Sequence, residues 1–163
     1  MPARPHLAAV LLACTAVVGV AGCGDGHPAV AGSPAYQIHA RTVPGAGRVL
    51  ADGHGYTLYI YVPDHRGRSR CYGLCAQAWP PLTLPAGVGR PVAGPGVRTA
   101  LLGTVRRADG ARQVTYNGWP LYLYESDREP GQATGQAEDM GLWWLLSAGG
   151  TVDKRPVTEG AAG

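Results

Sequence analysis

The sequence predicts a mostly β fold: a small pseudo-symmetric domain, a sandwich or barrel, built from two hairpin-containing repeats with a short helical turn near a cysteine pair. One observation is an internal repeat, in which residues 55–64 (GYTLYIYVPD) align without gaps on residues 118–127 (GWPLYLYESD). The other is Asn117-Gly118 between two alternating segments, a strong hairpin signal because both turn positions need positive φ. Two copies are too few for a solenoid, so we expect one domain.

The chain begins with the features of a bacterial lipoprotein signal peptide, residues 1–22. Arg4 precedes an apolar run at residues 7–21. That run holds about 15 residues, short of the roughly 20 that a membrane-spanning helix needs. Small residues lie before Cys23, as in a lipobox, so we predict that Cys23 becomes the acylated first residue and anchors the protein to the extracytoplasmic face of the cell membrane. The alternative is an ordinary secreted protein in which Cys23 is incidental.

Composition divides the rest of the chain. Residues 23–46 are rich in Gly, Ala and Pro and predict a flexible tether, and residues 151–163 predict a disordered tail. A third Gly/Pro-rich stretch, residues 85–97, separates a first repeat at about 47–84 from a second at about 98–150. The formal net charge of +3 gives no electrostatic case for nucleic acid as a partner, and export argues against it.

Local signals place the elements in order. In the first repeat, residues 48–50 and 56–62 are predicted strands around a turn at 52–55, followed by a helical turn at 71–78 that Pro80-Pro81 stops. In the second repeat, residues 101–107 and 112–116 are predicted strands around a turn at 108–110. Residues 119–124 then return along the second of them.

A two-residue turn at Asn117-Gly118 also fixes which residues oppose one another. The expected pairs are Tyr116 with Trp119, Val114 with Leu121, and Gln113 with Tyr122. Leucines and tyrosines therefore lie on opposite faces in each copy. The leucine face holds Leu58, Ile60, Leu121 and Leu123, and the tyrosine face holds Tyr59, Tyr61, Tyr122 and Tyr124.

Both copies contain one motif, formed by Tyr59, Tyr61 and Asp64 and by Tyr122, Tyr124 and Asp127. It matches Y-x-(F/W/Y)-x-x-D. With CYGLC at 71–75, WPP at 79–81 and YNGWPLY at 116–122, the chain resembles, over roughly residues 47–148, the secreted-repeat lipoproteins named for that motif. That family has no established biochemical activity, so the resemblance implies an architecture and an envelope location.

The motif has two interpretations. Its two rings lie about 7 Å apart on one strand face, and the aspartate follows where the strand breaks and can close an Asx-turn. The first interpretation is structural: the tyrosines form a second inner layer, with Asp64 and Asp127 closing turns. The second is an aromatic platform on which a sugar, a peptidoglycan fragment or a planar redox cofactor stacks.

Cys71 and Cys75 are the other candidates for chemistry. On one helical turn their Cα atoms lie about 6 Å apart, within reach of a disulfide, which is the expected state outside the cytoplasm. Alternatively, the arginines at 66, 68 and 70 lower the thiol pKa, and the reduced pair binds Cu(I) or exchanges disulfides. His54 and His65 flank the first motif strand and are candidate additional ligands, but turn histidines are more often simply solvated. We therefore predict neither a metal nor a cofactor.

The function inferred from sequence is correspondingly general. No nucleophile, phosphate-loop or dinucleotide motif occurs in the chain, so an enzyme has no support. The leading hypothesis is a lipid-anchored, non-catalytic binding or structural module of the envelope, whose partner is a cell-wall component or an envelope protein. The alternative is an extracytoplasmic redox or copper-handling lipoprotein that uses Cys71 and Cys75.

Overall fold

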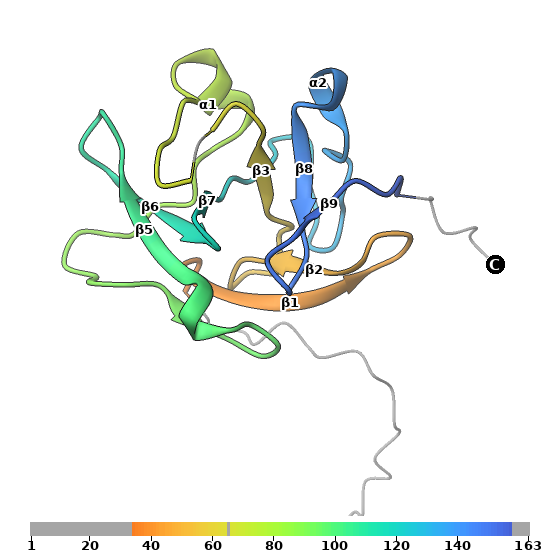
Figure 1. Ribbon diagram of the computed structural model, residues 1–163, viewed down its shortest axis with the longest axis horizontal. Coiled ribbons are helices and arrows are strands. Elements are labelled where there is room, and N and C mark those ends of the chain that lie inside the picture. Colours follow the sequence, from red (N-terminus) through yellow and green to blue (C-terminus); the bar gives the residue numbers. More distant parts are fainter. Residues whose placement is uncertain (1–33, 65, 158–163) are drawn as a thin grey trace, which may run out of the picture.

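The computed structural model describes residues 34–64 and 66–157. Its architecture is mostly β, as predicted, and α1 and α2 lie at the same end of the molecule while the curved β1 crosses the other end (Figure 1). The described residues form three small sheets, with strand orders β2-β1-β4, β3-β8-β9 and β5-β6-β7. In chain order the elements are β1 (Gln37–Val43), β2 (Gly47–Ala51), β3 (Tyr59–Tyr61), α1 (Leu74–Ala78), β4 (Val92–Ala93), a 3-10 turn η1 (Thr99–Leu101), β5 (Leu102–Arg106), β6 (Arg112–Tyr116), β7 (Trp119–Pro120), α2 (Glu138–Gly141), β8 (Trp143–Leu146) and β9 (Val152–Asp153).

The hairpin predicted around Asn117-Gly118 is present. Asn117 and Gly118 have φ of 49° and 79°, and β6 opposes Tyr116 to Trp119 as expected. The predicted pairing of Gln113 with Tyr122 is wrong. Beyond Leu121 the chain leaves β6, because Tyr122 pairs instead with Tyr59 and Pro81.

The first repeat begins earlier than predicted. β1 lies inside the segment expected to be a flexible tether, yet it pairs with β2 over five residue pairs and buries Ile38 completely. The β1–β2 hairpin is the counterpart of the β5–β6 hairpin in the second repeat. Likewise β4 lies in the predicted linker and pairs with β1, and β9 lies in the predicted tail and pairs with β8. Strand pairing thus extends into all three segments that were predicted to be a tether, a linker and a tail.

The two motif segments meet at the centre of the molecule. Tyr59 and Tyr122 exchange two backbone hydrogen bonds, each N–H donating to the other's carbonyl at 2.9 and 3.0 Å. On its other side Tyr59 pairs with Leu145 of β8, and Tyr122 pairs with Pro81 in the same way. Each motif segment is therefore flanked by the closing segment of the other repeat, and a pseudo-twofold axis passes between Tyr59 and Tyr122.

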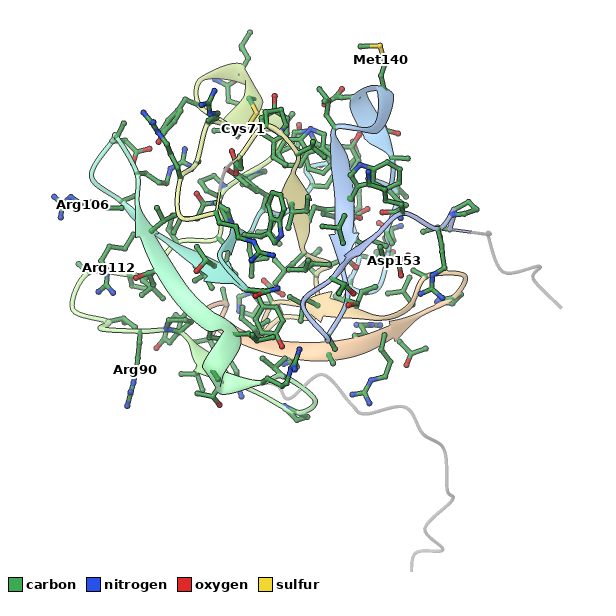
Figure 2. The ribbon with its side chains drawn as sticks, in the orientation of Figure 1. Cys71, Arg90, Arg106, Arg112, Met140 and Asp153 are labelled. Atoms are coloured by element: carbon green, nitrogen blue, oxygen red, sulfur yellow. A yellow bond between two sulfur atoms is a disulfide. The ribbon has the colours of Figure 1, made fainter. Side chains whose placement is uncertain are left out.

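Side-chain alternation separates the two strand faces as predicted, and each face is buried in a core of its own, as in the structural interpretation of the motif. One, the leucine core, includes Leu58, Ile60, Val114, Leu121 and Leu146. The other, the aromatic core, includes Tyr59, Cys71, Trp79, Tyr122 and Trp143. Charged side chains such as Arg90, Arg106 and Arg112 extend outward from this body (Figure 2).

Candidate functional site

The first tyrosine of each motif binds the aspartate of the other repeat. The Tyr59 hydroxyl donates to Asp127 Oδ2 at 2.7 Å, and the Tyr122 hydroxyl donates to Asp64 Oδ2 at 2.6 Å. Both tyrosines are fully buried, and the two aspartates are 2% and 6% exposed. We call these two hydrogen bonds the reciprocal lock, because each joins one repeat to the other across the pseudo-twofold axis.

The second carboxylate oxygen of each aspartate closes the loop that follows its motif. Asp64 Oδ1 accepts the Arg70 N–H at 2.7 Å. Asp127 Oδ1 accepts both the N–H and the hydroxyl of Thr134, at 3.0 and 2.6 Å. The turn-closing role predicted for the aspartates is therefore present, over loops longer than an Asx-turn.

Burial controls the protonation of the lock. Desolvation, reinforced by Asp127, raises the pKa of Tyr59, and desolvation, reinforced by the hydrogen bond to Asp64, raises the pKa of Tyr122. Desolvation also raises the pKa of Asp64, opposed by the hydrogen bond from Tyr122. Both tyrosines are therefore neutral donors at physiological pH, as a hydrogen bond to a carboxylate requires.

The second ring of each motif joins a continuous aromatic stack. Tyr61 stacks on Trp143 with ring centroids 4.5 Å apart, Trp143 on Trp79 at 3.9 Å, and Trp79 on Tyr124 at 4.0 Å. The tryptophans are buried in the middle and the tyrosines are half-buried at the ends. The tyrosine face is therefore an interior layer, with only the outer rings of Tyr61 and Tyr124 reaching the surface.

Cys71 and Cys75 form the predicted disulfide, with Cα atoms 5.3 Å apart. Cys71 is completely buried in the aromatic core, and Cys75 is half-buried at its edge. Cys75 lies in the first turn of α1, whereas Cys71 lies in the loop that precedes this helix, beneath its tip (Figure 2). Burial of one sulfur atom makes the bond part of the core packing.

The other residues that were singled out in the sequence contribute little to this site. His54 is exposed and its Nδ1 lies 3.9 Å from Asp52. Cys23, the predicted signal peptide and His65 lie outside the described residues. Across residues 34–64 and 66–157, no group of three or more His, Cys, Asp or Glu side chains is placed to hold a metal ion, and no helix is long and apolar enough to cross a membrane.

Arg107 is a site residue that the sequence did not reveal. It is 3% exposed, and its guanidinium donates to Ser69 Oγ, Gln113 Oε1 and the Cys71 carbonyl at 2.7 to 2.8 Å. Because the Tyr122 proton goes to Asp64, the Ser69 hydroxyl donates to Tyr122, at 2.7 Å. A hydrogen-bond chain thus connects Arg107 to the reciprocal lock. An arginine at the end of a predicted strand gives no local signal of such burial.

Comparison with known proteins agrees with this architecture. A family described as a secreted repeat of unknown function matches the chain twice, at residues 42–83 and 103–147, which together make up more than half of it. The two matches coincide with the two structural repeats. Searches of curated proteins and of solved structures give no match. The chain therefore belongs to this lipoprotein family of secreted repeats of unknown function and contains two copies of the repeat.

Proposed function

We propose that this protein is a lipid-anchored, non-catalytic envelope module, in which the duplicated motif is the scaffold and binding takes place at the surface. The observation that carries the proposal is the reciprocal lock. The side chains of Tyr59, Tyr122, Asp64 and Asp127 are buried and bonded to one another, so they hold the repeats together and present no group to a substrate.

Membrane attachment is supported by the predicted signal peptide that precedes Cys23 and by membership of a secreted lipoprotein family. Labelled palmitate supplied to the producing cells should enter the wild-type protein and remain with the membrane fraction. The Cys23→Ala variant should take up no label. Equal labelling of both proteins would exclude Cys23 as the anchor.

The proposal assigns no redox chemistry to the protein, and it therefore requires that the disulfide between the two cysteines be structural. Since Cys71 is packed in the aromatic core, we expect a structural disulfide with a reduction potential below about −300 mV. Equilibration of the purified protein with thiol buffers measures this potential, and Cu(I) titration of the reduced protein belongs in the same experiment. A higher potential, or stoichiometric Cu(I) binding, would replace the proposal with a redox or copper-handling function.

A further inference from the structure

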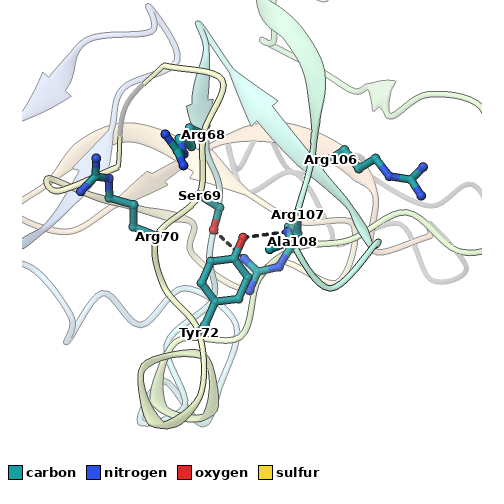
Figure 3. A pocket seen from close by; sticks show the side chains of 7 residues that line it. All are labelled: Arg68, Ser69, Arg70, Tyr72, Arg106, Arg107 and Ala108. Atoms are coloured by element: carbon teal, nitrogen blue, oxygen red, sulfur yellow. Dashed lines mark hydrogen bonds between the residues drawn. The ribbon is translucent and has the colours of Figure 1, made fainter.

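A basic recess lies beside the first repeat (Figure 3). Its side chains are those of Arg68, Ser69, Arg70, Tyr72, Arg106 and Arg107. They come from the segment that follows the first motif and from the end of β5. The recess is open to solvent, and its volume of roughly 670 Å³ is within the range of small-ligand sites.

The base of the recess is formed by the positively charged guanidinium of Arg107, which hydrogen bonds hold in place. This guanidinium lies 4.4 Å from the Tyr72 ring centroid. The Tyr72 hydroxyl accepts the Ala108 N–H at 3.0 Å, which leaves its own proton available to a ligand. A buried guanidinium in this setting keeps a positive potential at the base of the recess, because solvent screens it less than an exposed one.

Two exposed arginines, Arg68 and Arg70, line one side of the recess. Ser69 turns inward and is buried, so its neighbours Arg68 and Arg70 turn outward and are exposed. Among the described residues, neither guanidinium pairs with a carboxylate. Arg106 is also exposed and points away from the recess at its rim (Figure 3).

Two carboxylates oppose this charge. Asp109 lies at the rim, 3.1 Å from Arg107 Nε, and its side chain is half exposed. Asp64 is buried behind the wall, where it accepts the Tyr122 hydroxyl and the Arg70 N–H. Arg68, Arg70 and Arg107 outnumber these two carboxylates, so the recess keeps a net positive charge without Arg106, which points away from it.

The fold itself does not require this charge. In the second repeat, the loop that follows the motif is equivalent by the pseudo-twofold symmetry, yet its exposed charged side chains are mainly acidic. They are Glu129, Glu138 and Asp139, with Arg128 as the exception. Two equivalent loops with opposite charge indicate that the arginines serve something other than folding.

We propose that this recess binds a phosphate group of an anionic envelope component, presented on a lipid headgroup or on a soluble phosphate ester. Guanidinium groups suit this ligand because their planar donors match phosphate oxygens in pairs. The site rests on the proposed function, for which it supplies the ligand class. The reciprocal lock positions it, because Asp64 holds the Arg70 backbone and Tyr122 holds Ser69.

Calorimetric titration of the mature lipidated protein in a neutral detergent tests this site. One arm adds glycerol phosphate, and the other adds phosphatidylglycerol as mixed micelles, with phosphatidylcholine as the blank. The test variant is Arg68→Gln with Arg70→Gln, which leaves the Arg70 N–H in place. The matched control is Arg48→Gln with Arg90→Gln, which removes the same charge from exposed positions elsewhere.

The wild-type protein should bind in at least one arm, and the stronger arm identifies the source of the phosphate. The test variant should lose ~10-fold or more in affinity, and the control should stay within about twofold. Binding in neither arm would overturn the proposal, as would equal losses in both variants, which would indicate a general charge effect. These outcomes leave Cys23 acylation and the disulfide potential unchanged, so failure here is distinguishable from failure of the proposed function.

Discussion

Removing the Tyr122 hydroxyl should destabilise the domain far more than removing another hydroxyl of the same motif. Tyr122→Phe deletes the donor to Asp64 at 2.6 Å and the acceptor of Ser69 at 2.7 Å. A hydrogen bond to a charged group contributes roughly 1.5–3 kcal/mol, and Asp64 keeps its bond from the Arg70 N–H, so the expected loss is about 2 kcal/mol. For a domain of this size the melting temperature should fall by roughly 8 °C.

Urea denaturation measures the free energy of unfolding, and an unchanged slope would show that both states keep their compactness. Tyr124→Phe is the matched control. The Tyr124 ring is in the aromatic stack, but among the described residues its hydroxyl has no hydrogen bond. We expect this variant to change stability by less than about 0.5 kcal/mol. A Tyr122→Phe variant as stable as wild type, or equal losses in the two variants, would refute this assignment of roles.

Three further predictions concern the disulfide, the Asn117-Gly118 turn and a surface ion pair. Reducing the Cys71–Cys75 disulfide should cost about 2 kcal/mol, because the loop it closes is short, and identical urea curves with and without reductant would contradict a structural role. Gly118→Ala should cost about 1–2 kcal/mol, because φ there is +79°, whereas Gly89→Ala meets open space and should be neutral in the same thermal melt. Hydrogen bonds from Arg155 hold the pKa of the Asp153 carboxyl below its ordinary value of 3.8. The ionised carboxylate therefore stabilises the folded state above that pH, and this stabilisation is lost as the pH falls through the folded-state pKa. The stability gap between wild type and Asp153→Asn should therefore close on acidification, and a pH-independent gap would argue against this ion pair.

Features set by neighbouring residues could be predicted from the sequence. The Asn117-Gly118 turn depends on two residues that tolerate positive φ, and α1 ends where Pro80-Pro81 prevents its continuation. The disulfide was predictable from the close spacing of two cysteines in an exported chain, although α1 begins at Leu74 and Cys71 precedes it. Each of these signals is contained in a few consecutive residues.

Features that depend on distant partners could not be predicted in the same way. Tyr122 leaves its hairpin because backbone pairing with Tyr59 is available, and no local signal identifies a partner so far away in the chain. The same applies to the aspartate that each tyrosine binds and to the burial of Arg107. β1 is different, because applying the repeat offset to the strand predicted at 101–107 would have indicated a strand near 38–44, which overlaps β1.

The measurement that tests the central claim most directly is a pair of double-mutant cycles on the stability of the domain. If the lock joins the two repeats, Tyr59→Phe combined with Asp127→Asn should show a coupling energy of about 1 kcal/mol or more, because the two side chains share one hydrogen bond. Tyr59→Phe combined with Asp64→Asn, from the same motif copy, should be additive within about 0.5 kcal/mol. Coupling within one copy and none between copies would contradict the reciprocal lock.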